Sequence, residues 1–233
     1  MGKKRLMWIL GINMWIWICL CFSGNLFNTF AEENDNLELQ RLIEQIEAQE
    51  SRRKDFIADL CVEIKASYLG RPTTKKGSCS YEKGDLPRME LLKEEEKELR
   101  EGSIREKLNA FAEEFSKREF SEFSRLAFKL AEALKKMNRK DITLENKEES
   151  FDIIILRLKP AKIPFQVEIE INFNKGLVEK KRIVDFSGRI IRQEEVSYEE
   201  KEGAWYPKEY NSVSFEKGAQ VFCKIRLENI KAR

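Results

Sequence analysis

The sequence predicts an α+β protein in which about nine antiparallel strands form one sheet and helices cover its apolar side. Two observations predict this class. From residue 151 onward, apolar and polar residues alternate, as they do in strands with one buried face. Residues 94–140 and the stretch before residue 52 instead repeat apolar residues at helical spacing. A sheet with one apolar side must curl around its helices or around something else.

The amino-acid composition excludes several classes of function. The 233 residues are 42% hydrophobic and 36% charged, which fits one globular domain with the Lys/Glu bias of thermophilic proteins. The net charge of +2, with both signs interleaved, gives no electrostatic footprint for nucleic acid or an anionic membrane. Histidine and the common nucleotide and redox motifs are absent, and the carboxylates are expected on solvated faces. We therefore expect no enzyme, no cofactor and no metal.

The N-terminus resembles a secretory signal. Lys3, Lys4 and Arg5 precede an apolar run of 17 residues, Leu6 to Phe22, and residues 29–31 offer a cleavage site with small residues. We predict a signal peptide over residues 1–31 and a single domain over residues 32–233. The run reaches the lower limit for a spanning helix, so an uncleaved anchor is the alternative. In both cases the domain is expected outside the cytoplasm.

Three cysteines follow this segment, in a compartment that permits disulfides. Cys61 and Cys79 lie on the two arms of a predicted hairpin, and Cys223 lies near the C-terminus. A bridge between Cys61 and Cys79 and two plain buried cysteines are both open at this point.

The first predicted element after the signal is a helix that ends near Ser51. Asp35 and Glu38 resemble a capping box in front of a helical apolar repeat. The period then changes to two, and Phe56 to Tyr68 form a long predicted strand. Two more strands, Thr73 to Lys83 and Leu86 to Leu92, follow the turns around Pro72 and Gly84.

Residues 94–140 are predicted to be helical. Ser103 and Glu106 form an S-x-x-E cap before a stripe that includes Phe111, Phe115 and Phe123. A phenylalanine stripe of this kind either covers one face of a sheet or faces lipid, and the first interpretation is preferred. These helices are expected to act as a lid or plug.

Six more strands are predicted in the C-terminal part, joined by short turns. They are Phe151–Lys159, Phe165–Phe173, Leu177–Phe186, Arg189–Tyr198, Ala204–Phe215 and Gln220–Lys231. Within the fifth, Trp205 shares parity with Val213 and Phe215, so it is expected on the apolar side, with Tyr206 and Tyr210 outward. Pro207 indicates a strand start, a bulge or a free edge.

The order of these elements resembles the LolA family and its LolA-like relatives, which carry lipoproteins across the periplasm. The resemblance covers residues 37–92, with "DFIADLCVEIKASY" and "YEKGDLPRMEL", and residues 151–231, with "FDIIILRLKP", "VDFSGRIIRQEEV" and the late G-x-W-x-P of Gly203, Trp205 and Pro207. The chain departs from the family at residues 94–140, where a charged helical segment without Trp or Tyr replaces an Asp-Gly turn and an aromatic-rich strand.

The resemblance implies a strongly curved half-barrel with helices on its concave face. It also implies an extracytoplasmic carrier of lipid or acylated lipoprotein, with envelope proteins as further partners. The alternative is an interaction or envelope-sensor module, and the apolar positions also fit a closed core without a cavity. Residues predicted to line a cavity are Leu60, Val62, Ile64, Phe111, Phe115, Phe123, Val167, Ile169, Ile171 and Trp205.

Overall fold

The computed structural model describes residues 36–67, 71–92, 104–147, 150–159, 164–216 and 218–233. The predicted signal peptide, residues 1–31, and the Ser103 cap lie outside these residues. The chain divides into two units, residues 1–41 and residues 42–233. Of the first unit, the described residues 36–41 are helical. Everything below concerns the second unit, in which a helix covers residues 42–52.

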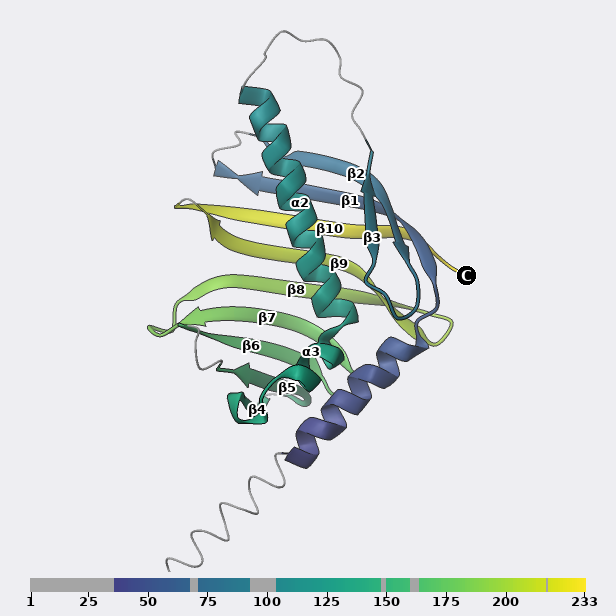
Figure 1. Ribbon diagram of the computed structural model, residues 1–233, viewed down its shortest axis with the longest axis vertical. Helices are drawn as coiled ribbons and strands as arrows, with labels where there is room; N and C mark the ends of the chain where they lie inside the picture. The colour runs from purple at the N-terminus through teal and green to yellow at the C-terminus, as the bar shows by residue number, and fades with distance from the viewer. Residues whose placement is uncertain (1–35, 68–70, 93–103, 148–149, 160–163, 217) are drawn as a thin grey trace, which may run out of the picture. The chain divides into compact units, whose positions relative to one another are not determined.

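All strands join one open antiparallel sheet in the order β3-β2-β1-β10-β9-β8-β7-β6-β5-β4 (Figure 1). The strands are β1 (Phe56–Ala66), β2 (Thr73–Tyr81), β3 (Arg88–Leu91), β4 (Ile142–Lys147), β5 (Ser150–Leu158), β6 (Phe165–Asn172), β7 (Leu177–Asp185), β8 (Ile190–Lys201), β9 (Ala204–Glu216) and β10 (Ala219–Ala232). The α+β class is confirmed, and an open sheet with β3 and β4 at its edges is consistent with a half-barrel. The described strands number ten, against about nine expected.

The additional strand is β4, which pairs with β5 at one edge of the sheet. Its sequence, ITLENK, has only a short alternation and directly follows a charged segment. Such a strand is stable because β5 supplies hydrogen bonds on one side, which no local pattern in the sequence reveals.

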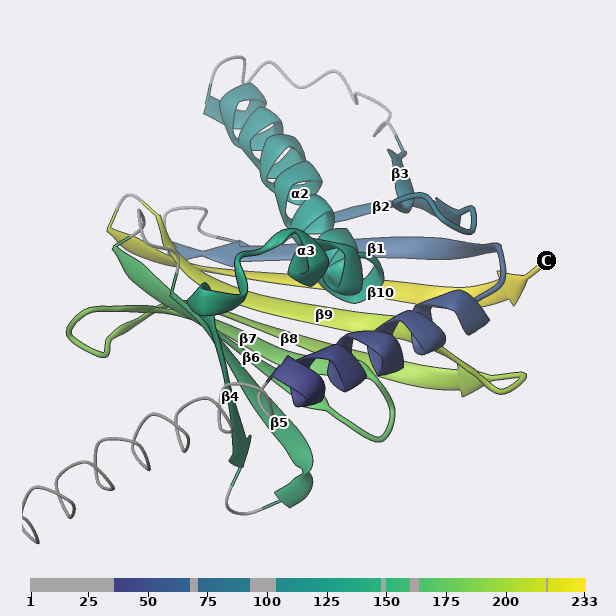
Figure 2. The same cartoon turned by 60° about the horizontal axis from the view of Figure 1, so that its bottom comes forward.

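The helical segment contains α2 (Ile104–Phe128), α3 (Leu130–Lys136) and the short 3₁₀ helix η2 (Arg139–Asp141). Lys129 separates α2 from α3 with a φ of −139°, outside the helical region. Helix α2 crosses one face of the sheet and contacts β1, β7, β9 and β10 (Figure 2). The prediction that this segment covers the sheet is therefore confirmed for the described residues.

The core lies between this face and the helices. Strand β1 buries every second residue from Phe56 to Ile64, as its alternation predicts. Antiparallel partners point to the same side, so the buried residues of β10, β6 and β5 continue this face. They include Val221, Cys223, Ile225, Leu227, Ile169, Ile171, Ile154 and Leu156.

The expected orientation of β9 was wrong. Tyr206 and Tyr210 are buried on the helix side, whereas Trp205 is half-buried and Phe215 is exposed. The expected parity rests on Val213 and Phe215, but these apolar residues lie on the outer face. A register shift between β8 and β9 next to Pro207 indicates a bulge, one of the three alternatives expected there.

Cys61, Cys79 and Cys223 are all free thiols. Cys61 pairs with Lys76 in the β1–β2 ladder and Cys79 pairs with Ala58, three positions further along the strand. Positions three apart on a strand point to opposite faces, so the two cysteines cannot be bridged. Burial raises the pKa of the Cys79 thiol to about 12. In the part of the chain that is described, no helix is long and apolar enough to span a membrane.

Gly176 offers a test of the packing between the β6–β7 turn and the helix over residues 42–52. Its φ is +61°, and a Cβ there would lie 2.5 Å from the backbone oxygen of Gln45. Gly176→Ala should lower the free energy of unfolding by about 3 kcal/mol, through left-handed strain plus this clash. Gly188→Ala, at a φ of +82° with open space around it, should cost only about 1 kcal/mol. Urea denaturation of both variants measures the difference, and equal losses would contradict the close approach.

Candidate functional site

The candidate site is the face of the sheet under α2, together with a pocket at the C-terminal end of that helix. Its apolar part is built around an aromatic cluster contributed by three strands and the helix. The aromatic cluster consists of Phe56, Tyr81, Phe123, Phe128, Tyr206 and Tyr210. Ring centroids of Tyr81 and Phe128 are 4.9 Å apart, and those of Phe123 and Tyr210 are 5.3 Å apart. These spacings are typical of stabilising aromatic pairs.

The structure places most of the predicted cavity residues on this face. On β1 and β6 these are Leu60, Val62, Ile64, Ile169 and Ile171, which are buried, and Val167, which is half-buried. From α2, Phe115 and Phe123 are buried and Phe111 is half-buried. Trp205 is half-buried at the start of β9, and the register shift next to Pro207 separates it from the alternation that ends at Phe215.

Trp205 has a different role at the start of β9. Its backbone oxygen accepts a hydrogen bond from Arg53 Nε at 2.8 Å. Its ring lies under the ammonium group of Lys175, 4.6 Å from the ring centroid. Trp205 therefore connects the start of β9 to the chain before β1 and to the β6–β7 turn.

Charged residues lie at the middle of the same interface. Glu119 of α2 is fully buried and accepts two hydrogen bonds from the Arg192 guanidinium, at 2.7 and 3.0 Å. Ser212 Oγ donates to the same carboxylate at 2.6 Å. Arg192 Nε also donates to the buried Glu194 at 2.6 Å, and Lys181 Nζ lies 3.1 Å from Glu194. We call Glu119, Arg192, Glu194 and Lys181 the ion network.

The ion network determines where α2 lies on β8 and β9. Burial disfavours the charge of Arg192, but Tyr210, Glu194 and Glu119 outweigh this and hold the pKa of the guanidinium above its ordinary range. A bidentate pair restricts both orientation and distance, unlike the apolar contacts around it. The network therefore specifies the position of the helix, while its desolvation limits what it adds to stability.

Sequence reasoning missed this network, because the carboxylates were assigned to solvated faces. A signal was present: Glu119 occupies the position between Phe115 and Phe123 at i, i+4 spacing, in the middle of the apolar stripe. Arg192 and Glu194 likewise share strand parity with the buried Val196.

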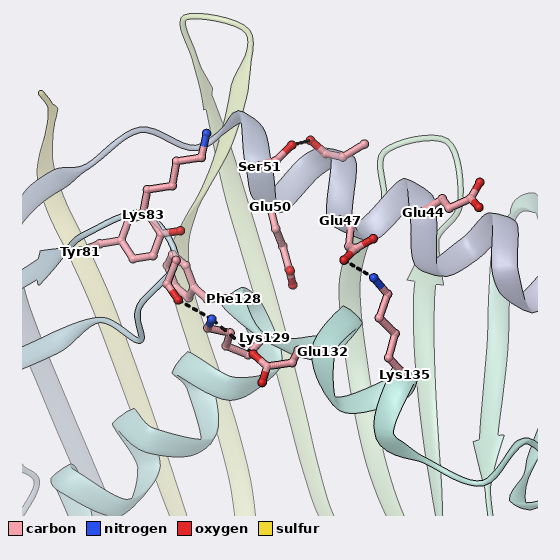
Figure 3. Close-up of a pocket in the computed structure, with 12 residues that line it drawn as sticks. Glu44, Glu47, Glu50, Ser51, Tyr81, Lys83, Phe128, Lys129, Glu132 and Lys135 are labelled. Atoms are coloured by element: carbon pink, nitrogen blue, oxygen red, sulfur yellow. Dashed lines mark hydrogen bonds and ion pairs between the residues drawn. The ribbon is translucent and has the colours of Figure 1, made fainter.

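An open pocket of about 730 Å³ lies next to the aromatic cluster (Figure 3). It is lined by Glu44, Glu47, Ala48, Glu50, Ser51, Tyr81, Lys83, Gly84, Phe128, Lys129, Glu132 and Lys135. Tyr81 and Phe128 belong to both the pocket and the cluster. Lys135 pairs with Glu47, and Lys129 lies 3.3 Å from Glu132 and donates to the Gly84 backbone oxygen. The pocket thus has a charged rim over an aromatic wall.

Glu50 and Arg53 connect this pocket to the end of α2. Arg53 is almost fully buried, donates to the backbone oxygen of Ala127, and places its guanidinium carbon 4.8 Å from the Phe128 ring centroid. Burial raises the pKa of Glu50 to about 7, although Arg53 and nearby backbone N–H groups oppose the shift. Glu50 Oε1 is buried without a hydrogen-bond partner among the described residues.

Nothing in this arrangement resembles a metal centre. Across the described ranges, no group of three or more His, Cys, Asp or Glu side chains is placed to hold a metal ion.

No protein-family model matches the chain, and no curated protein matches it. Among solved structures, the chain is similar to a LolA superfamily protein from Nitrosomonas europaea, with 11% identity, a TM-score of 0.45, and 83% of this chain and 93% of that chain covered. It is similar to a DUF1329 family protein from Desulfovibrio piger, with 10% identity, a TM-score of 0.48, and 85% and 92% covered.

A third similar structure, from Vibrio parahaemolyticus, is described as an outer membrane lipoprotein-sorting protein domain. It shares 10% identity, with a TM-score of 0.45 and 82% and 92% of the two chains covered. With TM-scores below 0.5, none of these similarities bears on what this chain binds.

The ion network can be tested by a double-mutant cycle. Glu119→Leu leaves Arg192 buried without its main partner and should lower the free energy of unfolding by about 3 kcal/mol. Adding Arg192→Leu should recover at least half of that loss. Glu113→Ala removes an exposed pair on the same helix, with Lys117, and should change stability by less than about 0.5 kcal/mol. If the losses from Glu119→Leu and Arg192→Leu simply add, the two residues are not coupled.

Glu50 should make stability depend on pH. The folded carboxyl keeps its proton up to about pH 7, whereas the unfolded one loses it near its ordinary pKa of 4.5. The folded state therefore binds more protons in this interval, and stability falls as pH rises through it, by on the order of 2 kcal/mol.

Glu50→Gln should remove this fall, which urea denaturation from about pH 4 to about pH 8 measures. The control is Glu132→Gln in the same pocket. Lys136 and Lys129 hold the pKa of Glu132 below its ordinary value, so this variant should keep the fall. Parallel pH profiles for wild type and Glu50→Gln would show that Glu50 is already ionised.

Proposed function

We propose that the protein is an extracytoplasmic binding protein, not an enzyme, that takes an acyl chain of a lipid or an acylated lipoprotein between the sheet and α2. The acyl chain would lie against Leu60, Val62 and Ile64 of β1 and against Ile169 and Ile171 of β6. Helix α2, with its phenylalanines, is the movable cover.

The observation that carries this proposal is the continuity between the pocket and the covered face. Tyr81 and Phe128 line the open pocket and also contact Phe56, which lies at the start of the apolar row on β1. An acyl chain that enters beside Phe128 therefore first meets the apolar row of β1, and the ion network lies between this row and the apolar residues of β6. The lysines and glutamates at the pocket rim can remain in contact with a polar head group.

The free energies of binding an acyl chain and of displacing α2 are compatible with reversible binding. Burying about 16 methylene groups contributes on the order of 10 kcal/mol before the costs of association. Displacing α2 exposes its apolar stripe, which opposes binding. Glu119 and Arg192 regain water at the same time, which offsets part of that loss. A cover held partly by buried charges is easier to open than an entirely apolar one.

The location and the partners rest on the N-terminal sequence and on the family resemblance. The basic and apolar segments within residues 1–31 support export by a signal peptide or retention as an anchor. Residues 32–233 are proposed as the single functional domain. Envelope proteins that deliver or accept acylated cargo are the proposed partners.

The test uses a photoreactive fatty acid and the full chain. Irradiation followed by peptide mass spectrometry should place crosslinks on β1 and β6, around Leu60 to Ile64 and Ile169 to Ile171, and excess palmitate should suppress them. Mapping is necessary because the apolar segment Leu6 to Phe22 can bind the probe by itself. Crosslinks confined to that segment would contradict the proposal, and would favour the alternative of a protein-interaction module.

A separate variant tests the role of α2 as a cover. Glu119→Gln keeps the size of the side chain but weakens the bond to Arg192, so crosslinking on β1 should become about tenfold faster. Glu113→Gln, on the exposed side of the same helix, is the matched control and should leave the rate unchanged. Equal rates in both variants would mean that α2 does not open through the ion network.

A further inference from the structure

Five large apolar side chains are exposed along one rim of the sheet, at the end where β1 and β9 finish and where β6, β8 and β10 begin. Phe186 is 87% exposed at the β7–β8 turn, and Phe215 is 58% exposed near the end of β9. The rim consists of Phe165, Phe186, Ile190, Phe215 and Phe222. Contiguous exposed apolar groups of this kind mark a surface that binds something.

The strand register shows that these residues form one continuous edge. Phe165 on β6 pairs with Asp185, which immediately precedes Phe186. Ile190 on β8 pairs with the other end of the same turn, at Val184. Figure 1 shows the β7–β8 and β9–β10 turns at the same side of the sheet, on the left of the view.

Strands β9 and β10 complete the edge. Phe215 on β9 pairs with Gln220, and Phe222 on β10 pairs with Val213, so the two phenylalanines are diagonal neighbours on the outer face. Helix α2 does not cover the outer face, because it packs on the opposite face, which carries Val221 and Cys223. Nothing on the covered face therefore accounts for the exposure of Phe215 and Phe222.

Basic residues flank the rim on both sides. Lys65 pairs with Phe222 and is exposed, and Arg71 is exposed just before β2 begins. Beyond β6, Lys159 at the end of β5 and Lys140 just before β4 are exposed at the same end of the sheet.

The acidic residues near the rim are already engaged or partly covered. Asp185 accepts hydrogen bonds from the backbone N–H groups of Ser187 and Arg189 and pairs with Arg189 Nε at 3.1 Å. Asp141 and Glu63 are half-buried. Glu216, at the end of β9, is a further carboxylate here, so the flanking Lys65, Arg71, Lys140 and Lys159 together with Arg189 leave this end with a small basic excess. The amino-acid composition alone does not reveal these basic residues as a group, because they come together only in the folded sheet.

We propose that this rim docks the protein onto the surface of an anionic phospholipid membrane. Phenylalanine side chains on turns and strand ends insert at the level of the head groups, and neighbouring lysines and arginines bind the anionic lipids. The charge complementarity selects a lipid surface over a second copy of the chain, which would bring two basic rims together. The inference does not depend on acyl-chain binding under α2.

The test is hydrogen exchange of the full chain with and without phosphatidylcholine vesicles that contain phosphatidylglycerol. Amides of residues 185–191 and 218–222 should exchange about tenfold more slowly with vesicles. The turns at the opposite end, residues 174–176 and 202–203, should not change. Residues 1–31 can tether the chain to vesicles by themselves. Tethering alone would leave the amides of the rim unprotected. Vesicle binding without protection of the rim would therefore overturn the proposal.

Variants separate the rim from other effects. The triple variant Phe186→Ser, Phe215→Ser and Phe222→Ser should lose the protection, whereas Leu86→Ser, an exposed leucine before β3, should keep it. Equal protection by vesicles of phosphatidylcholine alone would overturn the role of the basic flanks. Protection that rises with protein concentration in the absence of vesicles would identify a second copy of the chain as the partner, and would also overturn the proposal.

Discussion

The structure depends on how one amphipathic helix is held against the apolar face of an open sheet. A ten-stranded sheet that leaves this face to water would expose every second residue of β1 and its neighbours. Apolar contacts alone would cover the face but would let α2 slide or rotate, because dispersion and hydrophobic forces have little direction. The bidentate bond between Glu119 and Arg192 removes that freedom, since both donors and both acceptors must meet at one position of the helix.

A second anchor acts at the end of the same helix. The last carbonyl groups of a helix have no partner within it, and Arg53 supplies one for Ala127 while it also binds the backbone of Trp205. Lys129 then leaves the helical conformation, and α3 begins in a new direction. The C-terminal end of α2 is therefore tied to the chain before β1 and to β9, and its middle is tied to β8. Any opening of the cover has to break one of these two anchors first.

Local patterns in the sequence were sufficient for most of the fold. Alternation identifies nine of the ten described strands, because most of them have one face buried and their residues must obey a period of two. The alternation of "IRQEEV" in β8 was also visible, but its inward residues are Arg192 and Glu194, and a charged residue on a strand is normally taken as outward. Their partners explain them: Glu119 on the facing helix binds Arg192, and Lys181 on β7 binds Glu194. The same limitation applies to β9: Val213 and Phe215 do indicate a face, but it is the outer one, and the register shift next to Pro207 breaks the alternation before Trp205.

The ion network also bears on whether the covered face is a permanent core. Replacing a buried ion pair by apolar residues of similar size is often neutral or stabilising, so a core that never opens gains little stability from Glu119, Arg192 and Glu194. A cover that leaves and returns gains two things from them. The charges lower the cost of exposure, because they are hydrated when α2 is displaced, and they restore one register when α2 returns. The apolar flanks of the face supply the affinity for a chain-like ligand, and the charged centre supplies the reversibility, which a closed hydrophobic core does not need.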